Sequence, residues 1–195
     1  MTTIPADSEA DLIAQAQTGD RSAFGELVRR HQAGVVNVAY RLCGDVQLAE
    51  DAAQEAFIRA WLNLASYRPT SPLRNWLYRI AVNAALDALR RPPEASLDEG
   101  RAIMASEAHR EPEAAYIRQE RAQRVQKALL SLTPPNRAVV VLREYEELSY
   151  REIAAALDIP IGTVMSRLNY ARNALRELLR PEGMLVETVD DRTRD

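Results

Sequence analysis

The sequence has little of what catalysis, metal binding or disulfide bonding requires. Its single cysteine, Cys43, has no second cysteine for an intramolecular disulfide. Its two histidines, His31 and His109, lie far apart, and no zinc-ligand spacing surrounds either of them. The sequence contains no recognisable nucleophile–base pair, glycine-rich phosphate loop or metal-ligand cluster. We therefore expect neither an enzyme nor a bound metal or cofactor.

Long apolar stretches are also missing. No run approaches the roughly 18 apolar residues of a membrane span. The N-terminal stretch MTTIPADSEADLIAQ is acidic and lacks the apolar centre of a signal peptide. We therefore expect a soluble, cytoplasmic protein without a membrane span.

Glycine and strand patterns are scarce, which favours helices. Only 7 of the 195 residues are glycine, and no stretch alternates apolar and polar residues over the length of a strand. Apolar residues make up 47% of the chain, enough for a core, and alanine, leucine, glutamate and arginine dominate. The sequence predicts an all-α protein of two small helical domains.

The first predicted domain spans residues 8–91 and contains four amphipathic helices. Each helix begins at a residue that can cap it: Ser8, Asp20, Asp45 and Ser71. Glycines follow the first two helices, at Gly19 and Gly44, and the pair Pro92–Pro93 ends the fourth. We expect these helices to share one core.

The rest of the chain divides into a linker, a second domain and a tail. Residues 92–115 are acidic and without sustained periodicity, which indicates a flexible linker. A second four-helix domain is predicted over residues 116–180, with its first helix starting near Ala115. Between residues 118 and 180 the chain carries 11 basic and 7 acidic side chains, a weak basic surplus. Residues 181–195 form an acidic tail.

The last two helices of the second domain have the spacing of a helix-turn-helix, over residues 149–179. Ser149 and Glu152 form a capping box, and the DIP stretch separates a helix of about eight residues from a longer one. The longer helix carries an apolar stripe with spacings of three and four residues, which we expect to be buried against its neighbours: Ile161, Val164, Leu168, Ala171, Leu175 and Leu178.

The side of this helix opposite the stripe is polar. It carries Ser166, Asn169, Tyr170 and Asn173, flanked by Thr163 and Arg167 on one shoulder and by Met165, Arg172 and Arg176 on the other. Such a face suits the major groove, where hydrogen-bonding groups meet base edges and guanidinium groups meet phosphate or guanine. A plain helical hairpin with a solvated polar face has the same spacing and stays open as an alternative.

Three quoted stretches resemble one protein family in the expected order. The stretch LSYREIAAALDIPIGTVMSRLNYARNALRELL is similar to the C-terminal helix-turn-helix of bacterial RNA polymerase sigma factors of the extracytoplasmic-function (ECF) type, in the sigma-70 family. AEDAAQEAFIRAW resembles the polymerase-binding helix of that family, and SPLRNWLYRIAVNAALDALRR resembles its promoter-melting helix. The resemblance covers roughly residues 8–180 and implies promoter-specific transcription initiation.

The resemblance also implies contact residues. For the minus-35 promoter element they are Arg143, Thr163, Ser166, Arg167, Asn169, Tyr170 and Arg172. For the minus-ten element they are Tyr67, Arg74, Asn75, Arg79, Asn83, Arg90 and Arg91, a set of aromatic, amide and basic groups that suits unstacked bases and phosphates. For core RNA polymerase they are Asp51, Gln54, Glu55, Phe57, Arg59 and Trp61.

Two positions of the recognition helix depart from the family, which often has a basic residue where Met165 and Tyr170 stand. These departures leave the promoter sequence open. The resemblance further implies an anti-sigma factor as a partner, beside core polymerase and promoter DNA.

Two other functions remain as alternatives. A stand-alone repressor or activator would use the same helix-turn-helix, and it would need a dimer interface and bind DNA without polymerase. A protein-binding adaptor built from two helical bundles would tolerate changes at Ser166 and Arg167. The net charge of −3 favours the sigma factor over a solitary DNA-binding protein, which is usually strongly basic.

Overall fold

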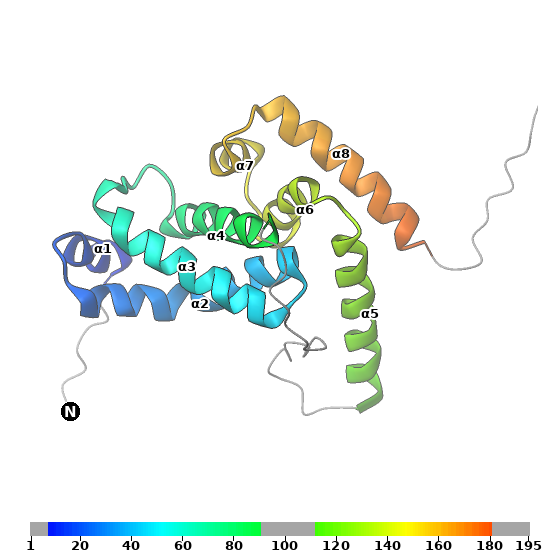
Figure 1. Ribbon diagram of the computed structural model, residues 1–195, viewed down its shortest axis with the longest axis horizontal. Helices are drawn as coiled ribbons and strands as arrows, with labels where there is room; N and C mark the ends of the chain where they lie inside the picture. The colour runs from blue at the N-terminus through cyan, green and yellow to red at the C-terminus, as the bar shows by residue number, and fades with distance from the viewer. Residues whose placement is uncertain (1–7, 91–111, 181–195) are drawn as a thin grey trace, which may run out of the picture.

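The computed structural model describes residues 8–90 and 112–180, and all regular elements in these ranges are helical (Figure 1). The all-α prediction is therefore confirmed. The N-terminal block contains α1 (Glu9–Gln17), α2 (Arg21–Cys43), α3 (Val46–Asn63), a short 3₁₀ turn η1 (Leu64–Ser66) and α4 (Leu73–Arg90).

The C-terminal block contains α5 (Pro112–Leu130), α6 (Pro134–Val140), a π-helical turn η2 (Val141–Tyr145), α7 (Tyr150–Leu157) and α8 (Ile161–Leu178). α5 begins three residues before the predicted start near Ala115, at a proline, which favours the first helical position because it has no N–H to leave unpaired. The remainder of the predicted linker, Arg91 and the acidic tail lie outside the described residues.

Local side-chain chemistry fixes the starts of α1, α2 and α3 at Ser8, Asp20 and Asp45, as the sequence predicted, whereas α4 begins at Leu73, two residues after Ser71. The Ser8 hydroxyl accepts a hydrogen bond from the Asp11 N–H, and the Asp11 carboxylate accepts one from the Ser8 N–H. Asp45 accepts from the N–H of Leu48 at the start of α3. Gly44 ends α2 at φ 77, a left-handed conformation that glycine adopts without a Cβ penalty.

Small residues on α3 allow the N-terminal block to be tightly packed. α3 buries five alanines toward its neighbours: Ala49, Ala52, Ala53, Ala56 and Ala60. This alanine face lets α3 lie close to both α2 and α4, while α2 supplies larger buried side chains such as Leu27 and Leu42. The described part of the chain contains no helix that is both long and apolar enough to cross a membrane.

The two blocks pack directly against each other. α7 lies on α4, and α5 crosses the C-terminal end of α2 (Figure 1). Buried residues of both blocks belong to one hydrophobic core. The sequence predicted two domains but gave no sign of this contact.

Two polar side chains of the C-terminal block hold the end of α2, and we call this contact the block junction. The Gln126 amide donates to the Tyr40 carbonyl at 3.2 Å. The Arg137 guanidinium, only 6% exposed, donates to three carbonyl oxygens, those of Leu42, Leu130 and Leu132. These carbonyls lie where helices end and leave acceptors unpaired, so the buried guanidinium compensates for them.

Candidate nucleic-acid interface

α8 is positioned by a short turn and an apolar stripe. Ser149 and Glu152 form the predicted capping box at the start of α7, and Asp158 ends α7 in a left-handed conformation with φ 53. α8 then packs on α6 and α7 through buried Val164, Leu168 and Ala171. The central part of the predicted stripe is therefore confirmed.

Both ends of that stripe were wrongly predicted as buried. Ile161 is 43% exposed and Leu178 is 49% exposed. α8 has 18 residues whereas α6 and α7 have seven and eight. The ends of α8 therefore extend beyond the helices that cover its middle.

The outward face of α8 presents polar and aromatic side chains to solvent. Ser166, Asn169 and Tyr170 are exposed, and Thr163 and Arg167 are partly exposed beside them. The Ser166 hydroxyl donates to the Thr163 carbonyl at 3.1 Å, which orients it along the helix. Five of the predicted minus-35 residues thus lie together on one accessible surface.

The other two predicted minus-35 residues have partners within the protein. Arg172 is hydrogen-bonded to Glu144 Oε1 through Nε at 3.0 Å and a terminal nitrogen at 2.7 Å. The hydrogen bond to Glu144 raises the pKa of the Arg172 guanidinium. Arg143 donates to the Leu148 carbonyl at 2.9 Å and its guanidinium lies over the Tyr150 ring. Arg143 therefore holds the chain that leads into α7.

The predicted minus-ten residues divide into an exposed and a buried group. Arg74, Arg79, Asn83 and Arg90 are exposed along α4. Tyr67 is only 4% exposed, packs on Trp76 with ring centroids 5.2 Å apart, and donates its hydroxyl to the Ser71 carbonyl. Tyr67 therefore shapes the turn before α4 from inside the fold.

Asn75 lies in the contact between the two blocks. It is 7% exposed, and its amide nitrogen donates to Glu152 Oε1 of α7 at 2.5 Å, while its amide oxygen has no hydrogen-bond partner among the described residues. Hydrogen bonds from Ser149 first, and from Asn75, lower the pKa of the Glu152 carboxyl. The neighbouring Tyr78 is buried too, and burial followed by its hydrogen bond to Glu146 raises its pKa. One turn of α4 is thus covered by α7 and the segment before it.

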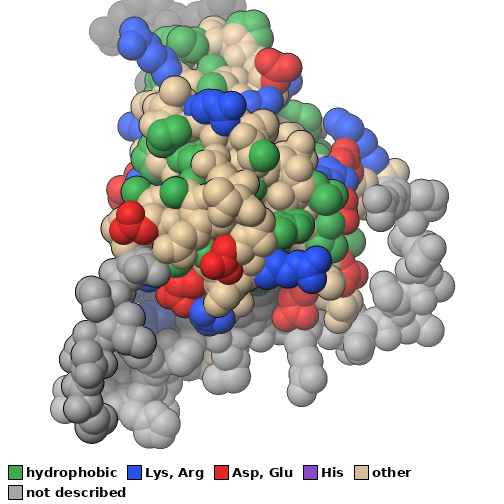
Figure 2. All heavy atoms as spheres, turned by 90° about the vertical axis from the view of Figure 1, so that its left-hand side faces the viewer, with side chains coloured by type: hydrophobic (Ala, Val, Ile, Leu, Met, Phe, Trp, Pro, Cys, Tyr) green, Lys and Arg blue, Asp and Glu red, His purple; other side chains and the backbone are tan. Residues whose placement is uncertain are grey.

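The basic side chains of this side of the molecule do not form a single patch. Figure 2 shows the face that includes the loop before α4, where Lys and Arg side chains lie in separate small groups with apolar side chains between them. This distribution agrees with the low net charge of −3. Attraction of DNA by the chain alone would therefore be weak.

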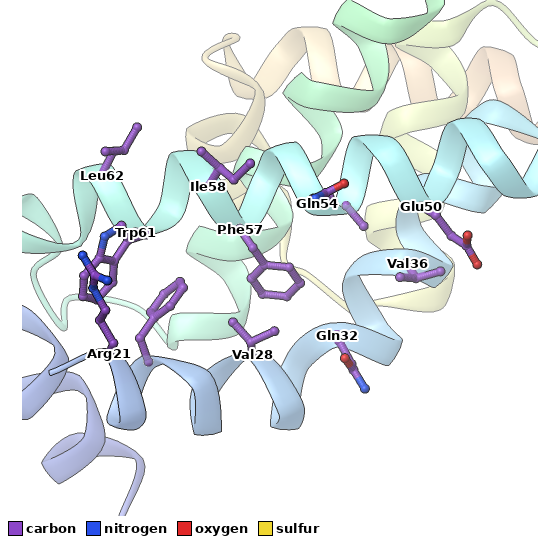
Figure 3. Close-up of a pocket in the computed structure, with 12 residues that line it drawn as sticks. Arg21, Val28, Gln32, Val36, Glu50, Gln54, Phe57, Ile58, Trp61 and Leu62 are labelled. Carbon is purple, nitrogen blue, oxygen red and sulfur yellow. The ribbon is translucent and has the colours of Figure 1, made fainter.

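A second candidate surface is an apolar groove between α2 and α3. It has a volume of about 600 Å³. Its walls are Phe24, Val28 and Val36 of α2 and Phe57, Ile58, Trp61 and Leu62 of α3, and polar side chains at its rim are Arg21, Gln32, Glu50 and Gln54 (Figure 3). Leu62 is 73% exposed and Ile58 48% exposed, unusual values for large apolar side chains.

The groove contains half of the residues predicted to bind polymerase. Gln54, Phe57 and Trp61 line it, and the Trp61 ring contacts Phe24 with centroids 5.0 Å apart. Phe24 and Val28 of α2 also line the groove, and their spacing does not distinguish a groove wall from a core stripe.

The other predicted polymerase residues lie outside the groove. Arg59 bridges Glu55 at 2.7 Å and Asp87 of α4 at 3.0 Å, and these hydrogen bonds raise the pKa of the Arg59 guanidinium. Asp51 is exposed and accepts a hydrogen bond from Gln47. Arg59 therefore connects α3 to α4, and Glu55 holds the Arg59 guanidinium from within α3.

Comparison with known proteins identifies the family of the chain. The family model described as Sigma-70 region 2 matches residues 27–92, and the model described as Sigma-70, region 4 matches residues 122–175. The chain is 40% identical over 181 residues to the ECF RNA polymerase sigma-E factor of Escherichia coli K12, covering 87% of this chain and 93% of the relative. It is 38% identical over 177 residues to the ECF RNA polymerase sigma factor SigW of Bacillus subtilis 168, covering 86% and 95%.

A solved structure shares the fold. The sigma factor RpoE in complex with the anti-sigma factor NepR, from Bartonella quintana, superposes with a TM-score of 0.62 at 25% identity. The match covers 82% of this chain and 98% of that one.

Proposed function

The chain belongs to the extracytoplasmic-function sigma factors of the sigma-70 family and directs promoter-specific transcription initiation by RNA polymerase, and from this premise we propose which surface does what. α8 reads the minus-35 element, the exposed face of α4 binds the minus-ten element, and the groove between α2 and α3 binds core polymerase.

The minus-35 assignment rests on one observation: α8 has one buried side and one exposed side. Val164, Leu168 and Ala171 are buried on one side, while Asn169 and Tyr170 are exposed on the other. A helix held this way by a preceding short helix and a turn can enter a major groove without disturbing the core. Polar groups on the free side then meet base edges, and Arg167 on its shoulder reaches phosphate or guanine.

For the minus-ten element, the exposed groups are one amide and several guanidiniums. Asn83 offers a donor and an acceptor to an unstacked base, and Arg79 lies one turn before it on α4. Asn75 points into the contact with Glu152. Its use on DNA requires α7 to leave α4, so engagement of both promoter elements involves separation of the two blocks.

The α2–α3 groove suits an amphipathic helix of the polymerase. Its apolar walls and polar rim resemble the grooves that accept such helices in other complexes. An anti-sigma factor, as in the related RpoE–NepR complex, would compete with polymerase for the sigma factor. We place this function in the cytoplasm, where the polymerase works, and assign the chain no catalysis of its own.

Reconstitution with core polymerase tests this function. The chain should co-purify with core enzyme and give run-off transcripts from a subset of genomic fragments, with transcript starts that share minus-ten and minus-35 elements. The chain alone should not protect those elements from nuclease, because its low net charge supplies little of the affinity for DNA. Protection of DNA by the isolated chain, or no association with core polymerase, would contradict the proposal.

A further inference from the structure

A methionine lies exposed on the outward part of α8. Met165 is 54% exposed. It lies near the N-terminal end of the helix, where recognition helices of this architecture contact base edges. An exposed apolar side chain at this place is available for an apolar contact with a base edge.

The guanidinium groups beside Met165 already have partners. At 100° per residue, Met165 shares its shoulder of α8 with Arg172 and Arg176. Arg172 is bound to Glu144 at 2.7 Å, and Arg176 donates to Asn173 Oδ1 at 2.8 Å. On this shoulder the side chain nearest the start of α8 is therefore a thioether, and both guanidinium groups farther along the helix are hydrogen-bonded within the protein.

The chemistry of a thioether restricts which base it can recognise. Guanine is read in the major groove by two hydrogen-bond donors, which methionine lacks. Thymine presents a C5 methyl group, and an apolar side chain recognises it by contact. Methionine also has three rotatable bonds, so it can adapt to the position of that methyl.

We propose that Met165 is a specificity-determining residue for the minus-35 element and contacts the C5 methyl of one thymine. This inference rests on the proposed docking of α8 in the major groove. The promoters of this sigma factor therefore carry a T·A pair at the position that Met165 faces. Tyr170, 62% exposed, borders the opposite edge of the outward face, so Ser166 and Asn169 are left between two large side chains.

Removal of a single methyl group tests the contact directly. Holoenzyme reconstituted from core polymerase and the full chain selects promoters from a library randomised over the minus-35 element. Each thymine of the selected element is then replaced by deoxyuridine, which lacks only the C5 methyl. One replacement should lower open-complex formation roughly fourfold, the effect of losing one buried methyl-sized group.

Variants at Met165 test whether the loss of open-complex formation with deoxyuridine depends on this side chain. With Met165→Ala, the same deoxyuridine replacement should have no effect, since the contact is already gone. With Met165→Arg, selection should move from thymine to guanine at that position. Ile117→Ala is the matched control, because Ile117 is a comparably exposed apolar residue (42%) on α5. It should keep the wild-type response.

The outcomes separate this inference from the proposed function. If no selected thymine responds to deoxyuridine, or if Met165→Ala keeps the wild-type response, Met165 does not read a methyl group, although minus-35 recognition still holds. If selection yields no minus-35 element at all, the docking of α8 itself is wrong. If Met165→Arg leaves the selected base unchanged, the assigned position is overturned.

Discussion

Replacement of Arg137 by alanine should make the two blocks unfold at different urea concentrations. Arg137 lies at the start of α6 and reaches the end of α2, where its terminal nitrogens donate to the carbonyls of Leu42, Leu130 and Leu132. It is 6% exposed, and burial lowers the pKa of its guanidinium. Alanine would leave these carbonyl oxygens without their donor inside the junction.

The expected loss in the free energy of unfolding follows from the number of carbonyl oxygens left without a donor. A buried polar group left unpaired costs about 1–3 kcal/mol. Three carbonyls at the lower limit of this range give a loss of about 3 kcal/mol in the free energy of unfolding. The lower limit applies because water can enter the space left by the side chain and no charge remains buried without a partner. This is a large part of the roughly 5–15 kcal/mol that stabilises an ordinary domain.

Urea unfolding followed by two signals measures this loss. Trp61 and Trp76 are the two tryptophans of the chain, and both lie in the N-terminal block. Tryptophan fluorescence therefore follows that block alone, while far-ultraviolet circular dichroism follows the helices of both. In the wild type the two transitions should coincide, since the blocks share one core. In Arg137→Ala they should separate, with the C-terminal block unfolding first.

Two further variants test whether the Arg137 hydrogen bonds stabilise the block junction. Arg137→Met keeps most of the apolar stem and should lose stability mainly through the missing hydrogen bonds. Arg124→Ala is the control, because Arg124 is exposed and donates to the Arg180 carbonyl within its own block. Coincident transitions in Arg137→Ala with a change below about 1 kcal/mol would refute the role of the junction, because that is less than one orphaned carbonyl.

Four other changes test the proposed surfaces. Arg167→Ala should weaken transcription from the cognate promoter and leave binding to core polymerase intact, as run-off and co-purification assays would measure; unchanged transcription would contradict the minus-35 assignment. Asn83→Ala should reduce discrimination at the minus-ten element, and a variant that keeps the wild-type base preference in a promoter library would count against it. Leu62→Ala should weaken binding to core polymerase about fivefold, the effect of an interface residue worth about 1 kcal/mol, with unfolding unchanged because the side chain is 73% exposed. Glu152 has a lowered pKa in the fold, so its stabilising contribution is present above the unfolded pKa and disappears as pH falls through the folded value. Glu152→Gln should therefore be less stable than the wild type near neutral pH, and the difference should shrink in urea titrations below about pH 4.5.

Much of the local structure follows from short-range chemistry. The capping boxes at Ser8 and Ser149 and the glycine stop at Gly44 involve residues within four positions of each other, so their letters predict the helix ends. The buried side of α8 follows from its three- and four-residue spacing. That spacing could not show that Ile161 and Leu178 are exposed, because exposure depends on how far the neighbouring helices extend.

The sequence by itself determined the all-helical fold, the caps of α1, α2, α3 and α7, the free face of α8 and, through family resemblance, the role in transcription initiation. Only the tertiary structure decided that Asn75 meets Glu152, 77 residues away, and that Arg137 reaches Leu42, 95 residues away. It also decided which half of the predicted polymerase residues lines the groove. The spacing of apolar residues predicts which side of a helix is shielded from water, but it does not predict which surface covers that side.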